Sequence, residues 1–484
     1  MNRQTLLVTV ATLALVVVGA VLLYAAPGSD PGHKPAGNAA AKVEKAGKAG
    51  KAGKGDKAKA AAAPNKVPVA ELIHAPGLPA DRVAAPAGAP NVVLVVMSTQ
   101  RRDQWSMYGG PPEVTPFLAA RAAAGVKFDD ALSVAVDPHA STSALVTGRF
   151  PHHLGVLNLG EKRANPPIAA EADTLAERFA AGGWFTVGLT ANHVLNEKAG
   201  GAQGFDWFRD AQQFSLMLEL RTSASELVDA TLERVAARTE AEKARPMFLQ
   251  LAFVDSHKPI KIPPDEFKPF AGENGEVAPY RASIRRQDDA LAKLVSGLAA
   301  QGLTDANTVF VVIADHGEGL EMPTHHRKQH GFVLYHSAVQ IPWVMWGKDV
   351  AAGKSVEGLA SQIDLAPTLL ALAGSPSGVE GVDGVDLSKV VKSGGATGRA
   401  EAYADTTYEG VHRASMWTAA HQCQKDFGSR DIGEDQFSDG CFDRKADPDF
   451  TQVIQDEPLM NKLAQMHTEL MAGVAGAEPA TAGE

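Results

Sequence analysis

Cysteine is nearly absent from this chain: Cys423 and Cys441 are the two examples among 484 residues. Zinc fingers need Cys or Cys and His at short spacings, and small disulfide scaffolds need a high density of cysteine. The pair forms no C-x-x-C motif. Both classes are therefore excluded, and the pair is left as either two buried thiols or one disulfide.

Basic residues are fewer than acidic ones, 46 Lys and Arg against 56 Asp and Glu, so the net charge is −10 at pH 7. The balance is uneven along the chain. Residues 1–66 hold ten Lys and Arg and three acidic residues, a net of +7, so the remainder carries −17. An acidic folded region argues against nucleic acid as a partner.

Charged residues are missing from residues 6–26, where Thr9 and Thr12 are the clearly polar positions. At about 1.5 Å per residue, this run spans a bilayer core of about 30 Å. It is longer than the apolar region of about 7–15 residues in a cleavable signal peptide. We expect a membrane-spanning signal-anchor, with a cleaved signal peptide as the alternative.

Residues 27–88 lack apolar periodicity and are rich in Ala, Lys, Gly and Pro. Such a composition cannot form a core and predicts a solvated linker. A basic linker next to a membrane can contact anionic lipid. A plain flexible spacer is the simpler interpretation.

From residue 89 onward, strands and helices alternate. Apolar runs predict buried strands at 92–97, 184–189, 247–254 and 308–313, and helices are expected at 117–125, 174–182, 223–240 and 281–301. Thr115 and Pro116 are expected to cap and begin the first helix. This alternation predicts an α/β fold with a mostly parallel sheet, whose chemistry lies beyond the carboxyl ends of the strands.

Four stretches carry a resemblance to a known family. Residues 98–103 read STQRRD, residues 145–156 read LVTGRFPHHLGV, residues 314–318 read ADHGE, and residues 361–374 read SQIDLAPTLLALAG. They resemble the sulfatase family of the alkaline-phosphatase-like superfamily, with its patterns DTxRxD, LLTGxYPHxxGV, SDHGE and DLAPTLLDLAG. The match extends over roughly three hundred residues.

The resemblance implies a domain organisation. It implies an alkaline-phosphatase-like three-layer α/β/α core at 89–396, a smaller C-terminal α+β subdomain at 397–472 and a loose tail at 473–484. Counting positive charge would place the lysine-rich linker in the cytoplasm, but large domains translocate largely regardless of charge. Together with the cysteine pair, the resemblance favours a membrane-anchored protein with its folded domain outside the cytoplasm, periplasmic or at the cell surface.

The resemblance also implies a divalent metal, Ca²⁺ or Mg²⁺ before Zn²⁺. Asp315 and His316 match the family's strand-end pair and are the expected metal ligands. Ser98 stands where the family has its first metal aspartate. Because a hydroxyl is neutral, this replacement removes a full charge from the cation's surroundings, so the metal is expected to bind weakly or not at all.

The family's nucleophile signature, C/S-x-P-S-R, is not present in this chain, which reads PHAST at residues 138–142. Counting back from Gly148 places Pro138 at the nucleophile and Thr142 at the arginine. Proline has no nucleophilic atom. Ser141 or a neighbouring hydroxyl could substitute as the nucleophile, or these groups could bond to the loop and cap its helix.

Two histidines are further candidates. His257 resembles the histidine of the family's DPHxP segment, and His330 that of GHGHSLYDE, in which Phe332 replaces a second cation. We therefore expect His257 and His330 to contact a substrate, with a turn histidine as the plain alternative for His257. His325, His326 and His330 could also form a new zinc site if the segment is helical.

These substitutions predict a sulfatase-like protein of the sulfuric-ester hydrolase type with impaired or lost activity. It would bind a sulfated or phosphorylated ligand, or a protein partner that the sequence does not identify. An active metal-dependent hydrolase with a rebuilt site and a structural envelope protein remain the two alternatives.

Overall fold

The computed structural model describes residues 82–160, 166–210, 222–270, 275–320, 330–429, 437–447 and 450–475. The predicted membrane span, most of the linker and the end of the tail lie outside these ranges, as do His325 and His326 of the zinc hypothesis. None of the helices in the described ranges has the length and apolar character that a membrane crossing requires.

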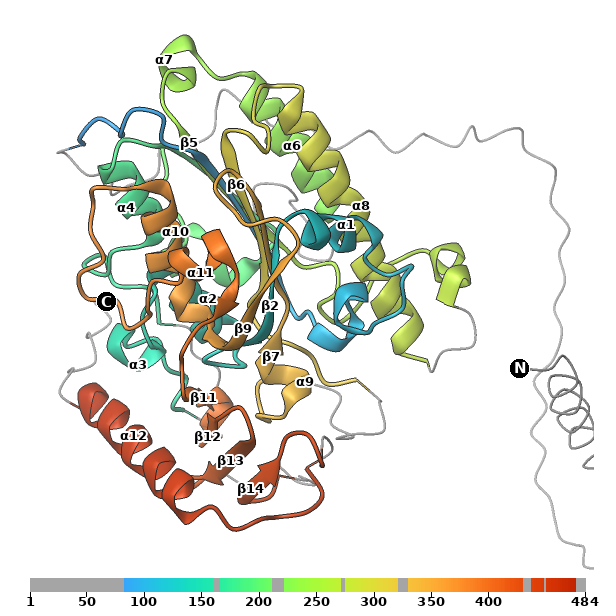
Figure 1. The fold of residues 1–484 in the computed structure, drawn as a ribbon, viewed down its shortest axis with the longest axis vertical. Helices are drawn as coiled ribbons and strands as arrows, with labels where there is room; N and C mark the ends of the chain where they lie inside the picture. Colours follow the sequence, from blue (N-terminus) through green and yellow to red (C-terminus); the bar gives the residue numbers. More distant parts are fainter. Residues whose placement is uncertain are drawn as a thin grey trace, which may run out of the picture. The chain divides into compact units, whose positions relative to one another are not determined.

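A ten-stranded sheet forms the centre of the fold (Figure 1), in the order β10-β9-β2-β8-β6-β1-β5-β3-β4, with β7 paired to β2. Its pairs are parallel except that β8 runs antiparallel to β2 and β6, and β7 antiparallel to β2. The strands are β1 (Asn91–Met97), β2 (Val126–Leu132), β3 (Phe185–Thr190), β4 (Trp207–Arg209), β5 (Met247–Phe253), β6 (Thr308–Ala314), β7 (Gln340–Ile341), β8 (Trp343–Gly347), β9 (Lys354–Ser361) and β10 (Gly395–Ala396). The predicted mostly parallel α/β sheet is confirmed.

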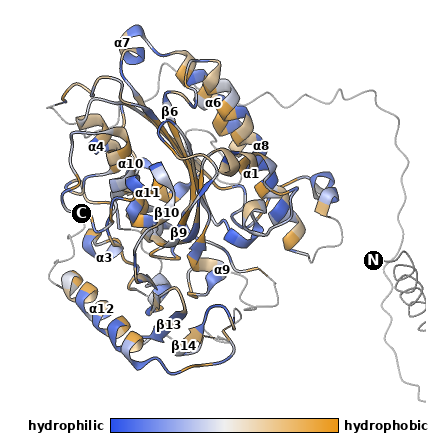
Figure 2. Cartoon of the chain, viewed as in Figure 1, coloured by the Kyte–Doolittle hydropathy of each residue, from blue (hydrophilic) through white to orange (hydrophobic). Residues whose placement is uncertain are grey.

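Helices cover both faces of this sheet, because its strands are apolar on both sides. In β1, Val92, Leu94 and Val96 belong to one hydrophobic cluster and the alternate residues to another. The first cluster includes α2 (Pro138–Thr147), α4 (Leu175–Ala181), α10 (Leu365–Ala373) and α11 (Ser388–Ser393), and the second includes α1 (Pro116–Ala124), α6 (Ala224–Ala236) and α8 (Val277–Ala299). Figure 2 shows hydrophobic residues concentrated along the central strands.

The C-terminal part is a smaller α+β unit, as expected. Its antiparallel sheet contains β11 (Ala402–Thr406), β12 (Arg413–Trp417), β13 (His421–Asp426) and β14 (Gly440–Asp443), in that order. Residues of α12 (Glu457–Ala475) pack with this sheet in one cluster. Cys423 and Cys441 face each other on β13 and β14 and form a disulfide, which resolves the choice between thiols and a disulfide.

Two helix predictions need correction. Thr115 precedes α1, but its hydroxyl bonds to Ser106, and the carboxylate of Asp288 on α8 accepts from Phe117 N and Leu118 N instead. The single helix expected at 223–240 is two helices, α6 and α7 (Glu240–Lys243). Thr239 causes this break, because its side chain accepts from Glu242 N and starts a new capped helix. The remaining short helices are α3 (Pro151–Leu154) and α9 (His336–Val339).

Candidate functional site

The predicted site residues follow three parallel strands that lie side by side. β1 lies between β5 and β6 and is parallel to both. Ser98 follows β1, His257 follows β5, and Asp315 and His316 follow β6. Because parallel strands end at the same edge, these side chains gather beyond the carboxyl ends of the sheet.

Asp315 is fully buried at this edge, and both of its carboxylate oxygens are hydrogen-bonded. Ser98 Oγ donates to Oδ2 at 2.8 Å. Thr99 N and His316 N donate to Oδ1 at 2.9 and 2.7 Å. Donors to a carboxylate stabilise its charged form, so neighbouring hydroxyl and backbone groups already compensate this buried charge.

The turn after β1 is held by neutral polar groups. Tyr280 of α8 donates its hydroxyl to Thr99 O at 2.5 Å and accepts from Arg101 N at 2.9 Å. Ser256 Oγ, from the loop after β5, donates to Ser98 O at 2.8 Å. Thr99 has φ of 58°, a left-handed conformation that is strained for a β-branched residue. The surrounding hydrogen bonds therefore impose the shape of this turn.

His316, His330 and Glu318 form a buried group next to Asp315. The rings of His316 and His330 are 4.6 Å apart between centroids. His330 Nδ1 lies 3.1 Å from each carboxylate oxygen of Glu318. Burial works against both charges, but the charge of His330 and its hydrogen bond outweigh burial and keep the pKa of Glu318 below its ordinary value. Burial likewise opposes protonation of His330, but the charge of Glu318 outweighs it and raises the pKa of His330.

His316 differs from His330 in its pKa, which burial lowers, whereas the pKa of His330 is raised. Its Nδ1 donates to Gly317 O at 2.7 Å. Its Nε2 is buried and accepts no hydrogen bond within the described structure. The nearby Asp315 Oδ2, at 3.7 Å, is beyond hydrogen-bonding distance. The ring is therefore a neutral tautomer with an acceptor nitrogen facing the site.

His257 lies at the edge of the same group, 5.1 Å from His330 between ring centroids. Its Nδ1 donates to Lys258 O at 2.7 Å. The Lys258 ammonium donates to Glu276 and to Gly319 O. The structure thus brings His257, His330, Asp315 and His316 close together, and their functional roles stay predictions.

The head of α2 occupies the position of the expected nucleophile. Pro138 is its first residue, and Asp137 caps it through Oδ1, which accepts from His139 N and Ala140 N. The other oxygen, Asp137 Oδ2, is buried and has no hydrogen-bond partner in the described structure. The charge of Asp137 acts on His330. With His316 Nε2, this oxygen gives the site two buried acceptors that a ligand donor or a water could satisfy.

The hydroxyl groups along α2 are engaged within the protein. Ser141 is fully buried and donates to Asp315 O at 2.6 Å, and Gln362 Nε2 donates to Ser141 Oγ at 3.0 Å. Thr142 donates to Pro138 O, one helical turn back. Ser141 therefore links α2 to the end of β6. Its role as a nucleophile stays a prediction that these contacts do not favour.

The residues around Asp315 do not fit the divalent cation that the resemblance implies. Hard cations take six or more oxygen ligands, including several carboxylates. Across the described ranges, no group of three or more His, Cys, Asp or Glu is arranged to hold a metal ion. Asp315 faces hydrogen-bond donors, and His316 adds one neutral nitrogen. No step below is derived through a metal.

Some residues of the site carried no sequence prediction of their role. Glu318 stands in the motif ADHGE, and an acid two residues after His316 was the available signal. Tyr280 comes from a distant helix, and no local pattern marks it, whereas Gln362 stands in the quoted stretch SQIDLAPTLLALAG, which gave no signal of its contact with Ser141. Phe332, expected at a lost cation, packs edge-to-face on Tyr408 with ring centroids 5.0 Å apart.

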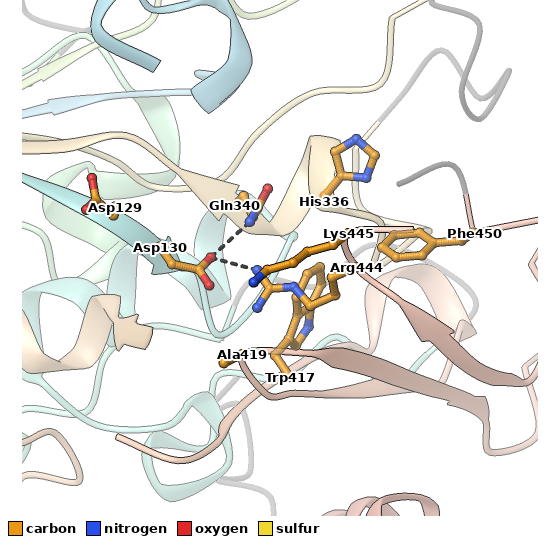
Figure 3. Close-up of a pocket in the computed structure, with 9 residues that line it drawn as sticks. All are labelled: Asp129, Asp130, His336, Gln340, Trp417, Ala419, Arg444, Lys445 and Phe450. Carbon is orange, nitrogen blue, oxygen red and sulfur yellow. Dashed lines mark hydrogen bonds and ion pairs between the residues drawn. The ribbon is translucent and has the colours of Figure 1, made fainter. Parts of the chain in front are cut away.

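A separate cavity of about 270 Å³ lies where the central sheet meets the small sheet (Figure 3). Within it, Asp130 accepts from Gln340 at 2.9 Å and pairs with Arg444 at 2.7 Å. Lys445 is exposed, and its charge acts on the nearby Asp443 carboxylate. The lining consists of Asp129, Asp130, His336, Gln340, Trp417, Ala419, Arg444, Lys445 and Phe450. The cavity combines acceptors, an exposed cation and aromatic surface.

Comparisons with known proteins agree with this fold. The family model described as Sulfatase matches residues 90–375, more than half of the chain. Arylsulfatase A of Homo sapiens is 26% identical over 453 residues, covering 82% of this chain and 86% of that protein. N-acetylgalactosamine-6-sulfatase of Homo sapiens is 25% identical over 380 residues, covering 68% of this chain and 72% of that protein.

Solved structures show the same fold. The crystal structure of Ps i-CgsB in complex with k-i-k-neocarrahexaose has a TM-score of 0.64 at 19% identity, covering 81% of this chain and 95% of that chain. The structure of BT1596, a 2-O GAG sulfatase, has a TM-score of 0.60 at 19% identity, covering 79% and 91%. The predicted family resemblance and fold class are confirmed.

Proposed function

Because the chain belongs to the sulfatase family, we propose that it is a membrane-anchored, extracytoplasmic member that binds a sulfated or phosphorylated ligand and has lost sulfuric-ester hydrolysis. The observation that carries this proposal is the head of α2. There Pro138, which has no nucleophilic atom, begins the helix at the position of the family's nucleophile. The nearest alternative hydroxyl, that of Ser141, is buried and engaged.

Two cations that the family resemblance leads us to expect are replaced by other residue types within the described site. A transferring sulfuryl or phosphoryl group develops negative charge on its oxygens, which enzymes stabilise with cations or aligned donors. Thr142, at the expected arginine, turns its hydroxyl to Pro138 O. Phe332, at a second expected cation, packs on Tyr408. Removing one such stabilising group typically costs about 10²–10³ in rate, so the combined losses leave little hydrolysis.

The described acids reinforce this conclusion. Asp137, Asp315 and Glu318 all lie in or beside the buried group, with His330 as the neighbouring cation. A sulfate dianion placed here would meet carboxylates and acceptor atoms. The two acceptors without partners, Asp137 Oδ2 and His316 Nε2, suit a ligand hydroxyl instead.

The cavity at the junction of the two sheets is the proposed place for the anionic group of a ligand. Arg444 is neutralised by Asp130, so the exposed Lys445 is the proposed cation for a sulfate or phosphate. Asp129 and Gln340 offer acceptors for hydroxyl groups. Among the structural relatives, Ps i-CgsB was crystallised with a neocarrahexaose and BT4656 with a disulfated glucosamine. A sulfated saccharide is therefore the probe of choice.

Hydrolysis is tested with the purified chain on an aryl sulfate and an aryl phosphate, each with added Ca²⁺, Mg²⁺, Mn²⁺ or Zn²⁺. We expect turnover near background. The combined variant Ser98→Asp, Pro138→Ser, Thr142→Arg restores a charge, a hydroxyl and a cation, and should gain weak activity that Phe332 still limits. Robust turnover by the wild-type chain that Ser141→Ala abolishes would overturn the proposal and make Ser141 the nucleophile.

Binding is tested with a sulfated oligosaccharide and its desulfated form. We expect Lys445→Glu to weaken binding of the sulfated form by about tenfold or more, since a hydrogen bond to a charged group contributes about 1.5–3 kcal/mol. Lys389→Glu changes an exposed lysine on α11, outside the cavity lining, and is the matched control. Equal affinity for both oligosaccharides would refute the ligand class.

Anchoring and location rest on residues 6–26. We expect the chain to stay in membranes after a high-salt wash and its folded domain to be digested by protease in intact spheroplasts. Release by salt alone would refute the anchor, and protection from protease would refute the orientation.

A further inference from the structure

The strongest disagreement between this chain and its family lies at the carboxylate of Asp315. The resemblance places a cation there, between Asp315 and an aspartate at the end of β1. In this chain β1 ends at Ser98, whose hydroxyl donates to Asp315 Oδ2 at 2.8 Å. We propose that hydrogen-bond donors have taken the place of the divalent cation, so that the fold is complete without metal.

The donors compensate the charge of Asp315. Three of them point at its two oxygens: Ser98 Oγ, Thr99 N and His316 N. These three bonds occupy both oxygens of a fully buried carboxylate. The donors come from the ends of β1 and β6, which are neighbours in the sheet, so the backbone fixes their direction.

The backbone conformation of Thr99 accompanies the hydrogen bond from its N–H to Asp315. Its φ of 58° is disfavoured for a threonine and directs its N–H toward Asp315 Oδ1. Such strain costs on the order of 1–3 kcal/mol and persists where the surroundings over-determine it. Tyr280 and Ser256 supply those surroundings through hydrogen bonds to Thr99 O and Ser98 O.

A second layer of neutral groups holds Ser256 in turn. Gln100 Nε2 and Gln287 Nε2 both donate to Ser256 Oγ, at 2.6 and 3.2 Å. Trp105 Nε1 donates to Gln100 Oε1 at 3.0 Å. All these side chains are buried. These bonds connect Trp105, Gln100 and Ser256 to Ser98, whose hydroxyl donates to Asp315.

The proposal is tested on the full wild-type chain by metal analysis after purification and by thermal unfolding in EDTA, Ca²⁺ or Mg²⁺. We expect well under one equivalent of metal and a Tm that changes by less than about 1 °C, because a ligand stabilises a fold only when it binds the folded state. Stoichiometric metal that survives buffer exchange, or a Tm that rises by several degrees with Ca²⁺, would overturn it.

Ser98→Asp is the informative variant. It replaces a donor to Asp315 by a second carboxylate, and like charges at this distance repel strongly in a buried site. We expect its Tm to fall by several degrees in EDTA and to recover by at least half of that loss in Ca²⁺. Ser98→Asn keeps a neutral donor at the same position and should stay indifferent to cations.

Each outcome decides the proposal. If Ser98→Asp is indifferent to Ca²⁺ while the wild type responds, the assignment of donors in place of metal is wrong. If Ser98→Asp does not fold, Ser98→Asn and the metal content of the wild type still settle the question. This inference stands apart from the proposed loss of hydrolysis: cation-independent turnover by the wild type would refute the latter alone, and bound metal without turnover would refute the former alone.

Discussion

Tyr280→Phe tests whether neutral hydrogen bonds hold the turn that carries Ser98 and Thr99. The substitution keeps the ring and removes one oxygen, which is fully buried. That oxygen donates to Thr99 O at 2.5 Å and accepts from Arg101 N at 2.9 Å. No other change in the molecule removes both contacts with so little change in volume.

The expected loss of unfolding free energy is about 3 kcal/mol. Each hydrogen bond contributes about 1 kcal/mol net, and each buried backbone group left without a partner costs about 1–3 kcal/mol. The strain of Thr99 adds to this loss, because its left-handed conformation is no longer held. Denaturant unfolding at constant pH measures the difference.

Tyr108→Phe is the matched control. The Tyr108 hydroxyl also bridges a carbonyl and an amide, since it donates to Trp343 O at 3.0 Å and accepts from Trp343 N at 3.3 Å. Burial raises the pKa of Tyr108, and the Trp343 groups that its hydroxyl binds are buried, so the expected loss is about 2 kcal/mol from the two hydrogen bonds, without the added strain of Thr99. A loss for Tyr280→Phe below about 1 kcal/mol, or no larger than that for the control, would refute the reasoning.

Three further predictions follow from buried groups. Burial raises the pKa of Asp255 to about 6, so the cost of burying its ionised form is absent below pH about 4 and grows as the pH rises toward 6. Asp255→Asn should therefore match the Tm of the wild type at pH 4 and exceed it at pH 7, by up to about 3 kcal/mol in unfolding free energy. An equal Tm of variant and wild type at both pH values would contradict this. Replacing Cys423 and Cys441 together by Ser opens a loop with a sequence separation of 18 and should cost about 3 kcal/mol in unfolding free energy, whereas an unchanged denaturation midpoint would show that the disulfide does not constrain the unfolded chain. Asp405→Ala removes the carboxylate that accepts from the Tyr403 hydroxyl and lies 2.9 Å from buried His152 Nε2, outside hydrogen-bond geometry, and should cost about 1 kcal/mol or more; a loss below half of that in denaturant unfolding would count against this carboxylate as a stabilising group.

The sequence predicted the parts of this protein that depend on local pattern. Apolar runs located β1, β5 and β6, and the residues that follow these strands had to meet at one edge of a parallel sheet. That geometry is why sequence patterns alone place Ser98, His257, Asp315 and His316 in one group. The count back from Gly148 that aligns Pro138 with the family's nucleophile stays a prediction; in the structure Pro138 is the first residue of α2.

The missed contacts depend on tertiary packing between segments far apart in the chain. Asp288 reaches the first turn of α1 across 170 residues, and Tyr280 reaches Thr99 across 181. Neither residue stands out in its own helix, because a Tyr or an Asp on an amphipathic helix is common on any face. The cap that Thr115 was expected to supply is lost for the same reason, since a distant carboxylate satisfies those N–H groups first.

The hydrogen bonds around Asp315 differ from those expected if a carboxylate had been replaced without any compensating donor. If a carboxylate had been replaced with no further adjustment, the remaining buried charge would be left without compensation, which is strongly destabilising. Instead the replacing side chain is itself a donor, and it joins two backbone N–H groups on the same carboxylate. A hydroxyl also forms a structural contact at α2, where Ser141 donates a hydrogen bond to the backbone carbonyl of Asp315. The carboxylate of Asp315 is thus held by three donors, and the buried acceptors without partners among the described residues beside it, Asp137 Oδ2 and His316 Nε2, are available to a ligand donor.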